Sequence, residues 1–211
     1  MKALENHGAL GVDLEAVAHA FQDKEVFAPI TSNILPATEC LIRGANGSGK
    51  STLGRIISGE LSPSAGSIRW STKEDSIDGE QVCHSAQRVS PATALHPVLS
   101  PRELVTFQGQ FRTWQDDPLQ LLVDAGMESH LNQAYQSLSS GMQQRVKLAL
   151  SMACQTGILV LDEPCANLDE SGKLWYRKAL KGLKGKTTLI VCSNDRIEDF
   201  IAPDTTIDVK N

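Results

Sequence analysis

The chain has 211 residues, of which 41% are hydrophobic and 5% aromatic, so it is long enough for one globular domain with a sizeable core but short for two independent domains. Twenty basic and twenty-five acidic side chains give a formal net charge of −5, and no overall positive field therefore favours nucleic acid or anionic lipid. No segment offers the roughly twenty uninterrupted apolar residues of a membrane-spanning helix. The charged, glycine-broken N-terminus lacks the apolar centre of a signal peptide.

The cysteines are odd in number and widely spaced, and they form no CxxC pair: Cys40, Cys83, Cys154, Cys165 and Cys192. This pattern indicates neither a zinc site nor a redox couple. We expect all of them to be small core residues in a reducing cytosol.

A glycine-rich loop in residues 39–59, ECLIRGANGSGKSTLGRIISG, follows a short apolar run and leads into a helical pattern. It matches GxxxxGK[ST], whose glycines let successive N–H groups line a phosphate site at a helix N-terminus. Lys50 is expected to reach the β- and γ-phosphates, and the Ser51 hydroxyl to bind magnesium. A plain turn needs glycines but has no use for this Lys-Ser pair. The predicted nucleotide ligands here are Gly44, Asn46, Gly47, Ser48, Gly49, Lys50, Ser51 and Thr52.

Two helical segments are predicted further along the chain. Residues 101–136 have room for two or three short helices, and the apolar spacing of LQLLVDAGMESHL, 119–131, predicts an amphipathic helix followed by a turn. Residues 138–153, LSSGMQQRVKLALSMA, read as a glycine-containing loop that opens a helix, with Ser139 or Ser140 as the N-cap. Taken alone, this second segment is an ordinary helix start.

Two adjacent carboxylates close an aliphatic run in residues 156–170, TGILVLDEPCANLDE. The run at 158–161 suits a central parallel strand buried on both faces, and ligands bind at the carboxyl ends of such strands. Asp162 can hold magnesium through water, while Glu163 can act as the general base for a water that attacks the γ-phosphate. An acidic pair after a strand is more often a solvated loop, but the phosphate loop favours catalysis here.

The last predicted strand lies in residues 187–195, TTLIVCSND, where a β-branched apolar run stops at Ser193, Asn194 and Asp195. Small polar residues after such a run usually form a turn. Whether they also border a catalytic site is left open by this segment alone.

Four motifs in order, GANGSGKST, LSSGMQQR, ILVLDEP and ANLD (166–169), resemble ATP-binding cassette proteins. The resemblance implies an α/β fold: a P-loop NTPase core with a mostly parallel sheet flanked by helices, an antiparallel β subdomain, and a small helical subdomain that carries the signature motif. It implies one nucleotide-binding domain, with 1–90 and 156–211 as the ATPase core and about 91–155 as the helical subdomain. The turn and strand at SPSAGSIRW, 62–70, also fit the family pattern.

The resemblance also implies a cofactor, partners and further site residues. ATP with Mg²⁺ would join a head-to-tail homodimer, or a heterodimer with another cassette, in which the phosphate loop of one subunit faces the signature of the other. The dimer would drive a separate integral membrane subunit from the inner face of the cell membrane. The compact chain is most similar to small one-cassette subunits of the heme-exporter type. The further residues implied are the signature Ser139, Ser140, Gly141 and Met142, Asp169 of the D-loop, and Phe21 against adenine, with Phe27 as the alternative.

The sequence departs from the family pattern at two functional loops. The glutamine expected near Pro91 is absent, and Gln87 lies four residues early. Asn194 stands where the family has a catalytic histidine, so it keeps an N–H donor but cannot carry a proton in the physiological range. The main hypothesis is therefore an ATPase, slow and weakly pH-sensitive, that powers transport.

Two alternatives remain. One is a nucleotide-gated binding module with little turnover, favoured by the missing glutamine and histidine. The other is a cassette in DNA repair or on the ribosome, which the short chain and the mild acidity disfavour.

Overall fold

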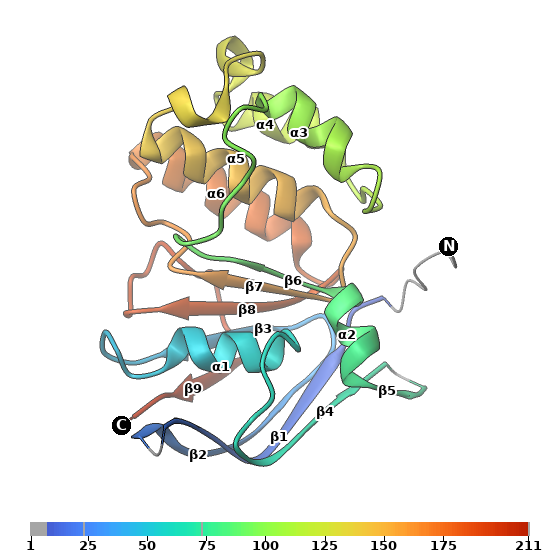
Figure 1. Cartoon of the computed structure of the whole chain (residues 1–211), viewed down its shortest axis with the longest axis vertical. Helices are drawn as coiled ribbons and strands as arrows, with labels where there is room; N and C mark the ends of the chain where they lie inside the picture. Colours follow the sequence, from blue (N-terminus) through green and yellow to red (C-terminus); the bar gives the residue numbers. More distant parts are fainter. Residues whose placement is uncertain (1–7, 23, 73, 211) are drawn as a thin grey trace. The chain divides into compact units, whose positions relative to one another are not determined.

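The computed structural model describes residues 8–22, 24–72 and 74–210, and these group into two compact units (Figure 1). The core unit comprises the described residues of 1–88, 156–163 and 184–211. The helical unit comprises 89–155 and 164–183. Residues 1–7 of the N-terminal segment, for which the sequence predicted no signal peptide, lie outside the described residues.

Two sheets form the core unit. The antiparallel sheet has the order β2-β1-β4-β5, and the other sheet has the order β6-β7-β8-β3-β9, in which β3 pairs in parallel with β8 and β9, and β7 with β8. The strands are β1 (Gly11–Phe21), β2 (Lys24–Ile34), β3 (Glu39–Arg43), β4 (Ala65–Ser71), β5 (Ser76–Ile77), β6 (Ala86–Val89), β7 (Ile158–Asp162), β8 (Thr188–Ser193) and β9 (Thr205–Asp208). The helices α1 (Lys50–Ile57) and α2 (Gly79–Ser85) also belong to this unit.

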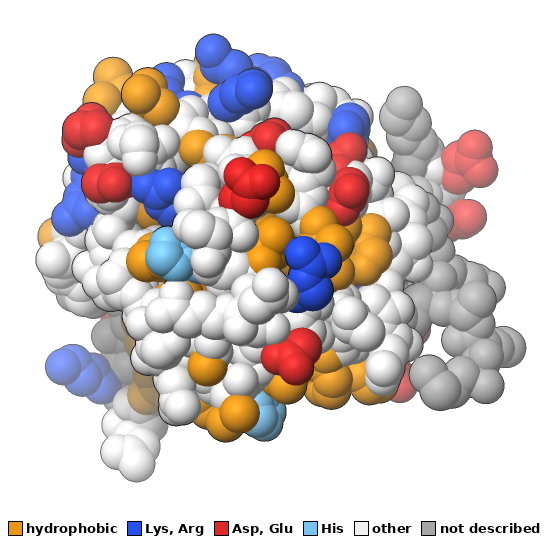
Figure 2. All heavy atoms as spheres, turned by 90° about the horizontal axis from the view of Figure 1, so that it is seen from above, with side chains coloured by type: hydrophobic (Ala, Val, Ile, Leu, Met, Phe, Trp, Pro, Cys, Tyr) orange, Lys and Arg blue, Asp and Glu red, His pale blue; other side chains and the backbone are white. Residues whose placement is uncertain are grey.

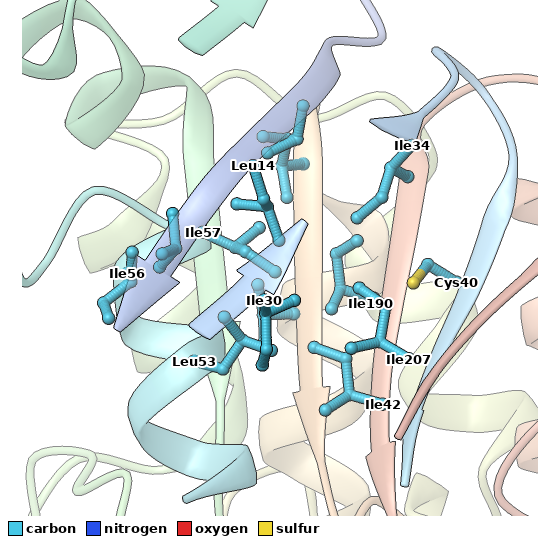
Figure 3. Packing of buried hydrophobic residues seen from close by; sticks show 14 of the residues in the cluster. Leu14, Ile30, Ile34, Cys40, Ile42, Leu53, Ile56, Ile57, Ile190 and Ile207 are labelled. Carbon is cyan, nitrogen blue, oxygen red and sulfur yellow. The ribbon is translucent and has the colours of Figure 1, made fainter. Parts of the chain in front are cut away.

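One apolar cluster joins both sheets and α1 (Figure 3). Leu14 of β1 and Ile30 of β2 belong to it together with Leu53 of α1 and Ile190 of β8. Every residue of β7 and of β8 is buried, which is why both strands are apolar at nearly every position in the sequence. Because both faces of these strands are buried, the strand ends are held in place, and so are the residues that follow them, Glu163 after β7 and Asn194 after β8.

The helical unit is built around α5 (Ser140–Ala153), which packs against α4 and α6. Its other helices are α3 (Pro101–Gln108), α4 (Pro118–Asp124) and α6 (Glu170–Leu183), with short 3₁₀ turns η1 (Glu128–His130) and η2 (Tyr135–Ser137). The sequence predicted an amphipathic helix followed by a turn in 119–131, and α4 ends at Asp124, where Gly126 takes φ +76°, a left-handed conformation that terminates helices.

Two surface observations complete the fold. Cys83 is exposed, whereas the other cysteines are buried, so the expectation that all five are core residues is wrong for Cys83. On the face shown in Figure 2, hydrophobic side chains are exposed between acidic and basic ones. None of the helices in the described part of the chain combines the length and apolarity needed to cross a bilayer.

Candidate functional site

Three glycines shape the loop between β3 and α1, and at two of them the surrounding atoms leave no room for a side chain. A Cβ on Gly44 would lie 2.5 Å from the Val209 carbonyl oxygen, and one on Gly49 would lie 2.7 Å from the Phe27 ring. Gly47 faces open space, but its φ of +79° still favours glycine. The sequence motif is therefore enforced by packing at two positions and by backbone conformation at the third.

Helix α1 begins at this loop with its N-terminus open. Gly49 is the N-cap and provides no side-chain hydrogen bond to the first turn, so these amides can receive an anion at the positive end of the helix. The ammonium of Lys50 is buried and donates to the carbonyl oxygens of Gly44 and Ala45, both at 2.9 Å. The Lys50 ammonium thus lies across a loop lined with N–H groups, an arrangement that suits a polyphosphate.

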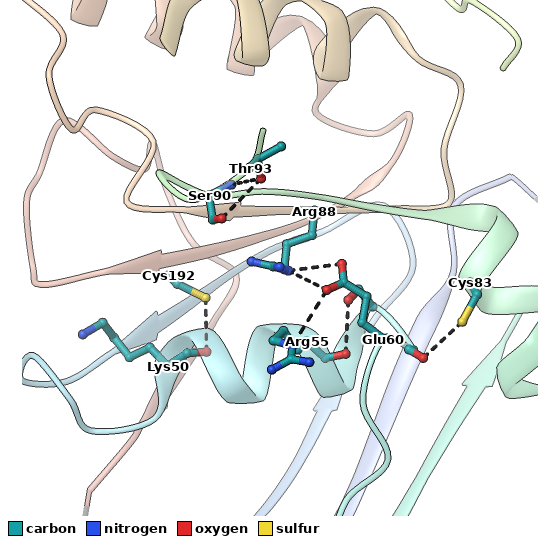
Figure 4. Close-up of polar contacts among 10 residues, drawn as sticks. Lys50, Arg55, Glu60, Cys83, Arg88, Ser90, Thr93 and Cys192 are labelled. Atoms are coloured by element: carbon teal, nitrogen blue, oxygen red, sulfur yellow. Dashed lines mark hydrogen bonds and ion pairs between the residues drawn. The ribbon is translucent and has the colours of Figure 1, made fainter. Parts of the chain in front are cut away.

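Asp162, the last residue of β7, is 5% exposed, and its carboxylate accepts a hydrogen bond from the Ser51 side chain. Burial raises the pKa of Asp162 above its ordinary value, while the Ser51 hydrogen bond and the charge of Arg88 oppose the rise. Arg88 is itself held at 3.0 Å by Glu60 (Figure 4). No group of three or more His, Cys, Asp or Glu side chains that could hold a metal occurs in the described ranges.

A hydroxyl beside a carboxylate is nevertheless a fitting donor set for magnesium. This ion prefers oxygen ligands and usually keeps several waters, using one or two protein groups together with substrate phosphates. Ser51 and Asp162 supply two such oxygens next to the phosphate loop.

Glu163 and Asn194 come together at the ends of neighbouring strands. The Asn194 amide nitrogen donates to a Glu163 carboxylate oxygen at 3.3 Å and also to the side-chain oxygen of Asn46 in the phosphate loop. Glu163 has φ +47°, and its N–H donates to the Cys192 carbonyl at 2.9 Å. The Asn194 side-chain oxygen is buried and has no hydrogen-bond partner within the described part of the chain.

Ser193 has a structural role at the end of β8. It is fully buried, and its hydroxyl donates to Asp199 at 2.6 Å while accepting from the Arg196 N–H at 3.1 Å. The turn predicted after this apolar run therefore begins at Ser193, where the Ser193 hydroxyl and the Arg196 N–H close it. One residue later, Asn194 contacts Glu163 and the phosphate loop.

The signature residues surround the N-terminus of α5 in the helical unit. Ser139 is the N-cap, and its hydroxyl accepts from the Met142 N–H at 3.3 Å. A Cβ on Gly141 would lie 2.7 Å from the Asn167 carbonyl oxygen, so only glycine fits. The hollow here measures about 430 Å³ and is lined by Gly126, Met127, His130, Ser139, Ser140, Gly141, Met142, Arg145, Asn167 and Asp169.

Asp169 lies in this hollow and also caps α6. Its carboxylate accepts from the Gly172 N–H at 2.8 Å and from the guanidinium of Arg145. These two contacts, the backbone one first, lower the pKa of Asp169. Sequence reasoning did not single out Arg145 or His130. The position of Arg145 one helical turn after Gly141 is the signal that could have found it.

The two candidate aromatic residues differ in exposure, and the segment expected to hold a glutamine forms a turn. Phe21 is 49% exposed at the end of β1, with its ring edge-on to His19, whereas Phe27 is 1% exposed within the core cluster. Phe21 therefore stays the candidate for contact with adenine. Gln87 lies inside β6, and Pro91 lies in a turn in which the Thr93 N–H donates to the Ser90 carbonyl at 3.0 Å.

Residues 27–166, more than half of the chain, match the ABC transporter family. The cytochrome c biogenesis ATP-binding export protein CcmA of Aromatoleum aromaticum is 28% identical over 191 residues, which cover 89% of each chain. A solved ABC transporter ATP-binding protein from Pyrococcus furiosus superposes with a TM-score of 0.78 over 94% of this chain and 97% of that chain, at 23% identity.

A further similar structure is a dimeric ATP-binding cassette in a post-hydrolysis state, bound to ADP and Pi. It superposes with a TM-score of 0.77 over 94% of each chain, at 24% identity. These likenesses confirm the predicted α/β cassette fold, and the family match confirms the predicted resemblance. The chain belongs to the ABC transporter family, as one of its ATP-binding subunits.

Proposed function

We propose that this subunit binds Mg²⁺ and ATP at the core unit and hydrolyses the γ-phosphate with Glu163 as general base. The observation that carries the proposal is the contact of Asn194 with both Glu163 and Asn46. It ties the candidate base to the phosphate loop, beside the Ser51 and Asp162 pair that suits magnesium.

Each protein group has a defined task in this reaction. The Lys50 ammonium and the open N-terminus of α1 offset the negative charge of the β- and γ-phosphates. Glu163 accepts a proton as the water oxygen bonds to the γ-phosphorus and the bond to the bridging oxygen breaks, which leaves ADP and phosphate. Magnesium, held by Ser51 and through water by Asp162, would neutralise charge on the phosphate oxygens.

In the proposed reaction, Asn194 positions Glu163 and the attacking water and transfers no proton itself. Its amide nitrogen holds Glu163, and its buried oxygen, which has no partner among the described residues, can accept a hydrogen bond from the attacking water. Both of its contacts through the amide nitrogen are with protein oxygens, those of Glu163 and Asn46.

We also propose that two cassettes sandwich ATP head to tail, as a homodimer or a heterodimer. Supporting this, the hollow of the helical unit places the Ser139 hydroxyl and the N-terminus of α5 on one surface, a second anion-binding helix end. The similar cassette solved with ADP and Pi is dimeric. Asp169, Ser140 and Met142 border the same hollow and would face the partner's nucleotide.

The dimer would work at the inner face of the cell membrane through a separate integral membrane subunit. The CcmA relative is named a cytochrome c biogenesis ATP-binding export protein. By that likeness we propose an export system of this general kind.

Phosphate release tests hydrolysis. The purified wild-type chain and Glu163→Gln are compared at saturating Mg-ATP, with Glu80→Gln, an exposed glutamate of α2, as the matched control. We expect turnover in the wild type and the control and at least a hundredfold loss in Glu163→Gln, because removal of a general base typically costs 10²–10⁴-fold. Equal rates in wild type and Glu163→Gln would refute the assignment.

The second candidate is a nucleotide-gated binding module. It is favoured by the Pro91 turn, which lacks the glutamine expected there, and by Asn194 in place of histidine. This function predicts tight ATP binding with negligible turnover in wild type and Glu163→Gln alike, with or without the membrane subunit.

A further inference from the structure

Two buried polar side chains of α5 each hold a proline carbonyl. Gln144 donates through its side-chain nitrogen to Pro164 at 3.0 Å, and Lys147 donates through its ammonium to Pro91 at 2.9 Å. Gln144 is 3% exposed and Lys147 is 8% exposed. Being three residues apart, they lie on the same side of the helix.

The two prolines have equivalent places in the chain. Pro164 lies two residues beyond the end of β7, directly after Glu163, and Pro91 lies two residues beyond the end of β6. β6 and β7 are neighbours in the sheet order. One helix, the helix that begins at the signature, is thereby bonded to the segments that leave two adjacent strands.

The energetics of Lys147 favour a functional reason for this arrangement. Burial lowers the pKa of Lys147, because loss of water disfavours the charged ammonium. No ion pair to Lys147 occurs among the described residues. A buried charge with one neutral acceptor adds little to stability, and apolar side chains of similar volume often do as well or better at such positions.

We propose that Lys147 and Gln144 are positioning residues that couple the signature helix to the Pro91 turn and to the segment behind Glu163. A shift of the Pro91 turn, which occupies the place where the family's glutamine is expected, is then passed to α5 through Lys147. A shift of α5 is passed to the segment after the base through Gln144. The inference rests on the proposed ATPase function and adds to it residues that touch neither nucleotide nor metal.

The test replaces Lys147 by methionine, which keeps the length and volume of the side chain but removes the donor. The matched control is Lys178→Met, at an exposed position of α6. Hydrogen exchange of residues 89–97 is followed by mass spectrometry, together with the melting temperature and the steady-state kcat and KM for ATP.

For Lys147→Met we expect an unchanged or higher melting temperature, at least threefold faster exchange in 89–97, and a several-fold lower kcat with KM within twofold. Lys147→Arg, which keeps a donor, should restore slow exchange. The control should match the wild type in every measurement. Gln144→Leu should lower kcat in the same way without faster exchange in 89–97.

A lower melting temperature with faster exchange along α5 itself would show that Lys147 is a structural residue, and unchanged exchange in 89–97 would also overturn the proposal. Exchange does not require turnover. If the wild type proves not to hydrolyse ATP, the proposed function fails while the exchange measurement still decides whether Lys147 holds the turn.

Discussion

Asn194 connects segments that are far apart in the sequence. Its amide nitrogen reaches Glu163, which is 31 positions away, and Asn46, which is 148 positions away. A neutral amide does this without changing charge between pH 5 and 8, whereas imidazole titrates in that range. In the proposed reaction, Asn194 would therefore set both the position of Glu163 and the pH response.

Replacing Asn194 by histidine tests this assignment. We expect Asn194→His to raise kcat several-fold, because imidazole reaches further and can carry a proton, and to introduce an acidic limb near pH 6 to 7, the range of an ordinary histidine. The measurement is kcat for ATP hydrolysis between pH 5.5 and 8.5. Asn194→Asp should lower kcat, since a second carboxylate would face Glu163 and the γ-phosphate. No gain with histidine would show that the site is built around asparagine.

The loop glycines give a second prediction, because two of them carry different constraints. Gly49→Ala would place a Cβ 2.7 Å from Phe27 and 2.8 Å from Val26 at φ +100°, whereas Gly47→Ala meets nothing within 4 Å at φ +79°. We expect Gly47→Ala to cost only the left-handed strain of about 1–2 kcal/mol and Gly49→Ala to cost more. Urea unfolding measures both, and equal losses would contradict the packing argument.

At the scale of elements, α3 is held by a reciprocal cap. The Glu103 carboxylate accepts from the Ser100 N–H at 2.8 Å and from the Ser100 hydroxyl at 2.7 Å, while the Glu103 N–H donates back to that hydroxyl at 3.3 Å. The backbone hydrogen bond from Ser100, followed by the side-chain one, lowers the pKa of Glu103.

This shift predicts an acid-dependent contribution to stability. A carboxyl whose folded pKa is lowered stabilises the fold above its unfolded pKa and loses that effect as pH falls through the folded pKa. Wild type should therefore exceed Glu103→Gln in free energy of unfolding at pH 7, and the difference should shrink below about pH 4, near the ordinary value for glutamate. Urea unfolding at both pH values tests it. A difference that does not change with pH would assign the effect to the cap geometry alone.

At the scale of the whole molecule, the sequence predicted the fold where local pattern and burial agree. The runs that became β7 and β8 are apolar at nearly every position because both strands are wholly buried, and the loop motif fixes the start of α1. The sequence predicted a helix followed by a turn in 119–131 but not the residue at which α4 ends, because the apolar pattern continues past Gly126 although the helix does not.

The candidate site could be predicted only in part. Motif spacing indicated the loop, the carboxylates and the signature, each of which lies within a few positions of the chain. The contacts of Asn194 with Asn46, Arg145 with Asp169, and Lys147 with Pro91 join distant segments. A local pattern can point to one residue of such a pair, as with Arg145, but its distant partner is set by tertiary packing, which no local pattern encodes.

The last prediction concerns the assembly of two cassettes around nucleotide. In Glu163→Gln, Mg-ATP should convert a monomer to a dimer on size exclusion, because bound ATP that is not hydrolysed keeps joining two helix N-termini, and chelation of magnesium with EDTA should reverse it. Adding Ser140→Glu should abolish the dimer. Ser140 is the first residue of α5 and is exposed, so a carboxylate there suits the helix end but repels a triphosphate. If this double variant binds ATP normally and still forms dimers, the signature does not face the partner's nucleotide.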